Sequence, residues 1–160
     1  MTITSGPPLR RPPSTRSGFV SLYERELGQQ VRRATLLVGS PDDAHDLVHD
    51  AFVEVYRRWD QLRDPGPYLS TSVLNRCRDF GRRRARRTRR AAQPAESSVH
   101  QADELWDALG KLPFNHRAAL VLRYYHQLPE REIAELLGCR PGSIGPWIQR
   151  GLRSLRKDLA

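Results

Sequence analysis

Residues 40–59 read SPDDAHDLVHDAFVEVYRRW and contain the clearest helix signal in the sequence. Ser40 suits a helix N-cap, and Pro41 suits the first helical position. Asp42 and Asp43 complement the positive end of the helix dipole. Apolar residues then recur every three or four positions, the spacing of one helix face; they are Ala44, Leu47, Val48, Ala51, Phe52, Val55 and Trp59. The stretch predicts an amphipathic helix with an acidic second face, made of Asp46, Asp50 and Glu54.

The same spacing predicts one helix before this stretch and one after it. The first runs from about Phe19 to Val38 and ends at Gly39, where a left-handed residue is expected. Asp64–Pro67 has the composition of a turn. A third helix should follow, with an apolar side made of Tyr68, Leu69, Val73, Cys77 and Phe80. It continues into residues 82–90, where seven of nine residues are Arg.

The composition changes after this arginine run, and four short helical patterns follow. The segment up to about Gln101 is rich in Ala, Gln, Pro, Ser and Glu, which predicts a linker. The last two patterns are separated by Gly138–Gly142, and Ser143 is expected to cap the final helix. We therefore predict an all-α chain of two small helical domains joined by a flexible linker. The expected divisions are a disordered tail at 1–17, a domain at 18–88, a linker at 89–102 and a domain at 103–160.

Charge and cysteine content favour an intracellular protein that binds a polyanion. Lys and Arg number 27 against 18 Asp and Glu, a formal charge of +9, which favours nucleic acid before membrane. Cys77 and Cys139 lie far apart and form no disulfide or zinc-binding pattern, so a reducing cytoplasm is expected. Apolar runs stay below the roughly 18 residues that a membrane span needs.

Catalytic and metal-binding patterns give no positive prediction. The sequence contains no evident nucleophile–base pair, phosphate-binding glycine loop or paired-carboxylate site. His45 and His49 are four residues apart, as metal ligands can be, but a third ligand is not evident. We therefore expect no enzyme activity, no cofactor and no metal site.

Two basic segments are candidates for DNA contact. Two short helices around a Gly-containing turn, the second one basic, indicate a helix-turn-helix, although a helical hairpin with a solvated basic face has the same pattern. The final helix begins with Gly145, Pro146 and Trp147, which offer no charged or amide side chain to a base. The run at 82–90 can neutralise phosphates, and the alternative is a solvated basic linker.

These motifs together resemble the extracytoplasmic-function (ECF, group 4) sigma factors, and within them the actinobacterial sigma-E-like type. DAHDLVHDAF at 43–52, DPGPYL at 64–69, Asn75 and Arg82–Arg84 resemble the family's first domain. A further set of segments resembles the family's second domain: Leu112-Pro113, Arg117, Leu120–Leu122, Glu132–Ala134 and Leu137–Cys139. The resemblance covers about Phe19–Arg90 and Leu105–Leu159.

The resemblance implies a sigma factor that binds core RNA polymerase and directs promoter-specific transcription initiation. The residues implied to dock on the β′ clamp helices are Asp43, Asp46, Leu47, Asp50 and Phe52. Those implied to melt and read the minus-ten element, with a flipped base, are Tyr68, Asn75, Arg76, Arg78, Arg82, Arg83 and Arg84. The second domain would contact the β-flap and the minus-thirty-five element, the DNA contacts being Arg140, Ser143, Trp147, Gln149, Arg150 and Arg153.

One departure from the family leaves alternatives open. The family usually has Thr-Val-Lys-Ser-Arg where this chain has Ser143–Trp147. Either Trp147, Gln149 and Arg150 read an unusual element, or the domain works mainly through protein contacts. The alternative function is a degenerate sigma-like protein that binds polymerase or a regulator, and a stand-alone helix-turn-helix repressor is a third. An anti-sigma or other regulatory protein is left open as a further partner.

Overall fold

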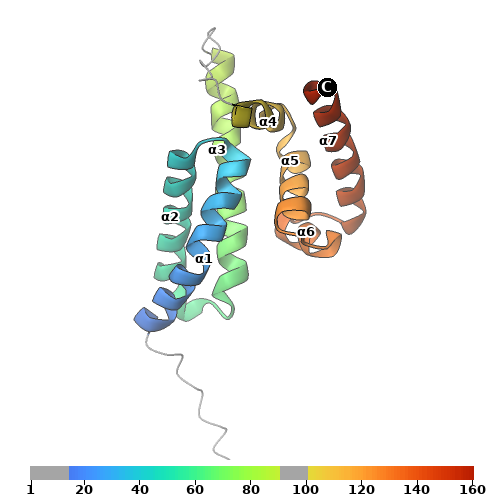
Figure 1. The fold of residues 1–160 in the computed structure, drawn as a ribbon. Helices are drawn as coiled ribbons and strands as arrows, with labels where there is room; N and C mark the ends of the chain where they lie inside the picture. Colours follow the sequence, from blue (N-terminus) through green and yellow to red (C-terminus); the bar gives the residue numbers. More distant parts are fainter. Residues whose placement is uncertain (1–14, 91–100) are drawn as a thin grey trace, which may run out of the picture.

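The computed structural model describes residues 15–90 and 101–160, and this part of the chain is built from helices and short connections (Figure 1). The first module contains α1 (Thr15–Val38), α2 (Pro41–Arg57), the 3₁₀ turn η1 (Trp59–Gln61) and α3 (Pro65–Arg90). The second module contains α4 (Gln101–Gly110), α5 (Phe114–Leu120), the π-helical turn η2 (Val121–Tyr125), α6 (Glu130–Leu137), the 3₁₀ turn η3 (Pro141–Ser143) and α7 (Ile144–Leu159). The expected all-α, two-domain fold is confirmed.

The ends of the helices differ from the expected boundaries by a few residues. Helix α1 begins at Thr15, four residues before Phe19, and α3 continues to Arg90. Helix α4 begins at Gln101, at the far end of the expected linker. The expected tail up to residue 14 and the expected linker at 91–100 lie outside the described residues.

Local chemistry explains most helix starts and stops. The Ser40 hydroxyl accepts a hydrogen bond from the Asp43 backbone N–H at 3.3 Å, so the predicted cap of α2 is confirmed. Gly39 and Gly138 follow α1 and α6 with φ of 79° and 66°, a conformation that suits glycine. Pro65 was expected in a turn but begins α3, because N–H groups of a first helical turn need no helical partner.

The expected cap at Ser143 is wrong. The turn η3 runs directly into α7, so Ser143 has helical backbone angles, φ −79° and ψ −25°. Its side chain makes no capping hydrogen bond. An N-cap residue needs an extended backbone to aim its oxygen at the following N–H groups, and Ser143 lacks that conformation.

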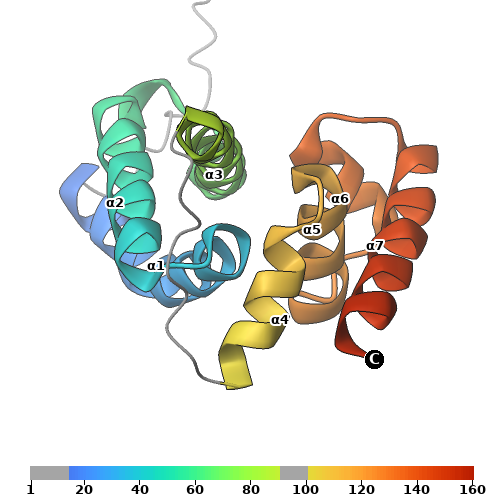
Figure 2. The same cartoon turned by 90° about the horizontal axis from the view of Figure 1, so that it is seen from above.

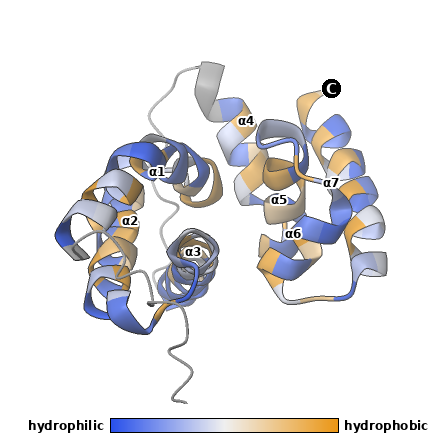
Figure 3. Cartoon of the chain, turned by 90° about the horizontal axis from the view of Figure 1, so that it is seen from below, coloured by the Kyte–Doolittle hydropathy of each residue, from blue (hydrophilic) through white to orange (hydrophobic). Residues whose placement is uncertain are grey.

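Helices α1, α2 and α3 pack around the core of the first module, and the view from above shows them grouped apart from α5, α6 and α7 (Figure 2). Apolar bands turn inward in both groups (Figure 3). The large side chains fully buried in the first module include Leu37, Val48, Phe52, Val55, Leu69, Val73 and Leu74. Burying each such side chain contributes about 1.5–3 kcal/mol relative to exposure. The apolar stripes found in the sequence are therefore the stripes that hold the bundle together.

The second module is organised by the contact between α5 and α7. Leu122, Ile133 and Ile144 are fully buried at its centre. Gly151 of α7 is also buried, and a Cβ placed on it would lie 2.7 Å from Leu120 Cδ1 of α5. The absence of a side chain at Gly151 lets the final helix approach α5 closely. Its basic side chains are thereby held on the opposite, exposed surface.

Arginine side chains connect the two modules. The Arg117 guanidinium of α5 donates to the Leu37 carbonyl at the end of α1, and to the Leu109 and Leu112 carbonyls at 2.8 and 3.0 Å. Arg78 of α3 donates to the Leu137 carbonyl of α6 at 3.5 Å. The Leu37, Leu109 and Leu137 carbonyls lie in the last turns of α1, α4 and α6, so the guanidinium charge there meets the negative end of a helix dipole.

Candidate polymerase and DNA interfaces

The acidic residues of α2 form an exposed face. Asp46 and Asp50 are exposed, whereas Asp43 and Leu47 are half-buried at its margin. The buried residues of α2 lie on the opposite side of the helix and are Ala44, Val48, Ala51, Phe52 and Val55. This arrangement places two carboxylates one turn apart, pointing away from the core, in a protein of net charge +9. We call Asp46 and Asp50, with Asp43 and Leu47 at their margin, the α2 acidic face.

Phe52 does not belong to this surface. Its side chain is 2% exposed, and the rings of Phe19 and Tyr23 pack on it at centroid distances of 6.1 and 4.9 Å. Phe52 therefore supports α2 from inside the module. Tyr56, one turn further along α2, is 53% exposed and packs on Phe19 at 5.0 Å. Sequence periodicity did not single out Tyr56, because one aromatic residue beside an apolar stripe has no distinctive pattern.

The residues of α3 that were expected to contact DNA do not all share one face of the helix. Tyr68, Asn75 and Arg82 are spaced by seven residues, so they share one face, which we call the α3 ridge. Asn75 and Arg82 are exposed, as is Arg83 beside them, and Tyr68 is half-buried. The ridge can present an amide and guanidinium groups to a nucleic acid.

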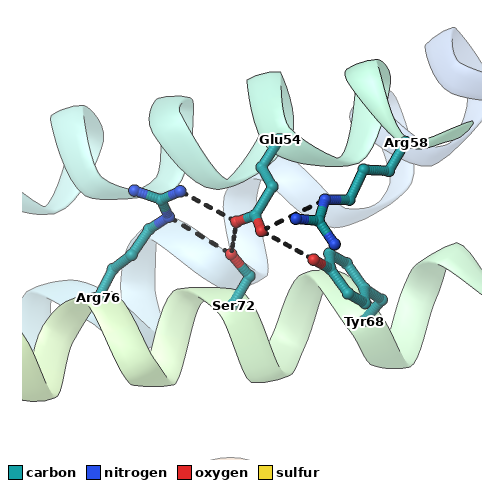
Figure 4. A network of polar contacts seen from close by, with 5 residues as sticks. All are labelled: Glu54, Arg58, Tyr68, Ser72 and Arg76. Atoms are coloured by element: carbon teal, nitrogen blue, oxygen red, sulfur yellow. Dashed lines mark hydrogen bonds and ion pairs between the residues drawn. The ribbon is translucent and has the colours of Figure 1, made fainter.

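A second face of α3 meets α2 at the Glu54 carboxylate (Figure 4). This carboxylate accepts hydrogen bonds from Tyr68 Oη at 2.7 Å, from Ser72 Oγ at 2.8 Å and from Arg76 Nη2 at 2.9 Å. Arg58 Nε lies 3.9 Å from the same carboxylate. The Tyr68 hydrogen bond, with those from Arg76 and Ser72, lowers the pKa of Glu54 to about 2, so the carboxylate is ionised near neutral pH. We call these five residues the Glu54 network.

The Glu54 network changes the roles expected from the sequence. Glu54 was grouped with the acidic surface, yet it faces α3 and is occupied by three donors. Tyr68 and Arg76 were expected to face DNA, and the network holds one polar group of each. Sequence analysis could not find this pairing, because residues 54 and 68 belong to different helices whose relative rotation is set by core packing.

Two further arginines of α3 reach the ends of other helices from different sides of α3. Arg78 lies over the Phe114 ring at 5.3 Å in addition to its bond to Leu137. Arg84 donates to the Val38 carbonyl at 3.1 Å. Both arginines donate to main-chain carbonyls in this structure, although the Arg84 side chain is also exposed, as are those of Arg82 and Arg83.

In the second module, the expected contacts lie mostly on the exposed surface of the helix-turn-helix formed by α6, η3 and α7. Its exposed members are Arg140, Gln149, Arg150 and Arg153. Ser143 and Trp147 are half-buried, and Trp147 packs against the apolar core with its ring 6.4 Å from that of His116. The indole therefore helps to seat α7 in its own module.

Two further observations concern metal and membrane. His45 and His49 are exposed on α2, and within residues 15–90 and 101–160 no three His, Cys, Asp or Glu side chains are grouped as a metal site would need. Among the helices described, none combines the length and apolar character required to cross a bilayer.

Comparison with known proteins places both modules in one family. Residues 22–87 match the family described as Sigma-70 region 2, and residues 102–155 match Sigma-70, region 4. The RNA polymerase sigma-E factor of Streptomyces avermitilis is 32% identical over 139 residues, which cover 81% of this chain and 78% of the relative. This chain belongs to the ECF sigma factors of the sigma-70 family. The sigma-E factor of Streptomyces coelicolor is 31% identical over the same shares of the two chains.

Solved sigma factor structures share the fold. The sigma factor RpoE of Bartonella quintana, solved with the anti-sigma factor NepR, superposes with a TM-score of 0.72 at 21% identity, covering 89% of this chain and 97% of that one. CnrH, solved with the cytosolic domain of CnrY, gives a TM-score of 0.69 at 25% identity, covering 90% and 88%. The region 2 match spans most of α1–α3, and the region 4 match spans most of α4–α7.

Membership in the family establishes the general function. This sigma factor binds core RNA polymerase and promoter DNA and directs promoter-specific transcription initiation. Sigma factors are a non-catalytic class of transcription factor. The reading as a degenerate sigma-like protein is not favoured by these matches, because both regions are present in their usual order.

Proposed function

We propose that the α2 acidic face docks this sigma factor on the β′ clamp helices of core polymerase while the α3 ridge contacts the minus-ten element. The observation that carries the proposal is the separation of charge. Asp46 and Asp50 are exposed on α2, whereas Asn75, Arg82 and Arg83 are exposed on α3, in a chain of net charge +9. One face suits a basic protein surface, and the other suits a polyanion.

The minus-ten contacts are assigned to the exposed part of α3. Asn75 offers an amide that can bond a base edge, and Arg82 and Arg83 offer phosphate contacts. Extracting a base from a duplex costs a few kcal/mol, so these phosphate contacts help to offset it. Arg78 and Arg84 reach DNA in this scheme only after they leave the Leu137 and Val38 carbonyls.

The second module is assigned to the β-flap and the minus-thirty-five element. Arg140, Arg150 and Arg153 are exposed and suit phosphate contacts, with Gln149 as the available amide. Because Trp147 packs on its own module and Gly145 and Pro146 have no polar side chain, base reading at the start of α7 should be weak. This module then contributes affinity more than sequence discrimination.

Regulation by an anti-sigma protein is part of the proposal, since the sigma factor RpoE, which has this fold, was solved with the anti-sigma factor NepR. CnrH, which also has this fold, was solved with the cytosolic domain of CnrY. We further infer a cytoplasmic protein without catalytic activity of its own, in keeping with its relatives.

Run-off transcription tests the assignment of function. Core RNA polymerase from Streptomyces coelicolor, the source of one relative, is mixed with a genomic fragment library with and without this protein. We expect discrete transcripts that depend on the protein. Core binding without transcripts would support a polymerase-binding module, and duplex binding without core binding would support a repressor.

A charge reversal tests the docking face. Asp46→Arg together with Asp50→Arg should abolish core binding in a pull-down, because four units of charge change on the exposed face of α2. Glu24→Arg together with Asp79→Arg makes the same change at exposed sites of α1 and α3, away from the α2 acidic face, and should leave docking in place. Equal core affinity for the α2 double variant and the wild type would remove the assignment.

A further inference from the structure

The Glu54 network lies at the start of the α3 ridge. Tyr68 is the first ridge residue, and Asn75 and Arg82 follow it at intervals of seven. Arg76 is adjacent to Asn75 and turns toward α2, where its side chain remains 34% exposed. A single carboxylate therefore sits beside the part of α3 that is assigned to promoter DNA.

Glu54 fixes the conformation of both neighbours. The bond from Tyr68 Oη holds the far end of the ring, and the bond from Arg76 Nη2 holds the guanidinium. Arg76 Nε also faces Ser72 Oγ at 3.4 Å, so the guanidinium plane is set at two points. Two of its five N–H groups serve the network, and the other three lie outside it.

Groups fixed in this way suit a single nucleic acid strand. An aromatic ring with a set orientation is a stacking surface for an unpaired base, and base–aromatic stacking is tolerant of sequence. A planar guanidinium with N–H groups outside its own network can bond a phosphate. Neither group then loses torsional freedom when the strand binds, and that loss otherwise weakens binding.

We propose that Glu54 is a positioning residue for the separated promoter strand: it holds the Tyr68 ring as a stacking surface and the Arg76 guanidinium as a phosphate-binding group. The proposal rests on the proposed minus-ten role of α3. Glu54 acts through its two neighbours and need not touch DNA itself.

The sign of the effect distinguishes positioning from simple electrostatics. Removing the negative charge of Glu54 makes the surface beside α3 more positive by one unit, and electrostatics alone would tighten binding to a polyanion. Positioning predicts the opposite sign, because Tyr68 and Arg76 lose their common anchor. Asp79 provides a matched control, since it is an exposed carboxylate on the same helix, outside the Glu54 network.

The experiment measures binding of reconstituted holoenzyme to one strand of a promoter recovered by run-off transcription. The probe is a fluorescent single-stranded oligonucleotide of that sequence, and core affinity is measured in parallel. Glu54→Gln should weaken strand binding about tenfold, the scale set by ordering two side chains on binding. Asp79→Asn, with the same charge change, should bind the strand as tightly as the wild type or more tightly.

Tyr68→Phe keeps the ring and removes its bond to Glu54, so it should give part of the loss and serves if Glu54→Gln fails to fold. Glu54→Gln combined with Tyr68→Phe should fall short of the product of the two single effects, because both act on one contact. Strand binding by Glu54→Gln equal to or tighter than wild type would overturn the proposal. A parallel loss of core affinity would also overturn it, by assigning Glu54 to docking. Failure of the wild-type protein to bind core would instead overturn the proposed function.

Discussion

The close approach of α5 and α7 predicts that two helical glycines respond oppositely to alanine. Gly81 lies inside α3, where a Cβ would meet no neighbouring group within 4 Å. Gly151 lies in the middle of α7, where a Cβ would lie 2.7 Å from Leu120 Cδ1 and 3.2 Å from Leu120 Cγ. The two substitutions are chemically identical, so only the surroundings differ.

The magnitudes follow from two opposing terms. Replacing glycine by alanine in a helix stabilises by roughly 0.5–1 kcal/mol. At Gly81 this gain should appear nearly undiminished, because the added methyl meets no neighbouring group within 4 Å. At Gly151 the added methyl must displace Leu120, which is 5% exposed, and overpacking a core costs typically about 1–3 kcal/mol. Gly151→Ala should therefore be less stable than Gly81→Ala by about 1–3 kcal/mol.

Urea unfolding followed by far-UV circular dichroism measures the difference. The wild type and both variants are unfolded in the same buffer. Their free energies of unfolding are compared with one common slope for the dependence on urea concentration. Gly81→Ala should raise the midpoint, and Gly151→Ala should lower it or leave it unchanged. Equal stabilisation by both variants would show that α7 does not approach α5 as closely as Gly151 indicates.

Two more predictions concern salt and pH. Binding of holoenzyme to duplex promoter should weaken with salt, and Arg82→Ala with Arg83→Ala should reduce the slope of log K against log salt by about 1 to 2, because each phosphate contact contributes about 0.9. Arg25→Ala on α1 is the control and should leave the slope unchanged. An unchanged slope in the Arg82 and Arg83 variant as well would exclude phosphate contact by these two arginines. Burial, with Arg33 and Arg32 nearby, lowers the pKa of His126 to about 4. Because an unfolded His binds its proton near pH 6.5, His126 contributes stability above that pH and loses it as the pH falls toward about 4. In urea unfolding, the stability advantage of the wild type over His126→Gln should therefore shrink as the pH is lowered from about 6.5 to about 4. A stability difference that stays constant over this pH range would refute the role of His126.

The helices themselves could be predicted because apolar periodicity reports the buried face directly. In α2, Ala44, Val48 and Val55 were expected on the apolar side and are fully buried. The Ser40 cap and the Gly39 terminus were also predictable, since each depends on residues adjacent in sequence. Local chemistry therefore determines where these elements begin and end.

Contacts between helices could not be predicted in the same way. Ser143 has the residue type of a cap, but η3 places it in a helical conformation, and a short preceding turn of this kind leaves little trace in composition. The apolar pattern at 118–125 suggests one short helix, but the structure divides it between the end of α5 and the π-helical turn η2. Arg117 matched a family motif, yet its bond to the Leu37 carbonyl joins segments 80 residues apart. Such pairings depend on how whole helices rotate and pack.

The positive charge of the chain overstates its capacity to bind DNA. Arg117, Arg84 and Arg78 bond helix-terminal carbonyls. Each of these guanidiniums must exchange an existing partner for a phosphate, so its net contribution to binding is reduced by the bond it gives up. Salt dependence counts the phosphates that displace counterions. The measured slope should therefore follow the exposed arginines of α3 and α7 and fall well short of the number that composition alone implies.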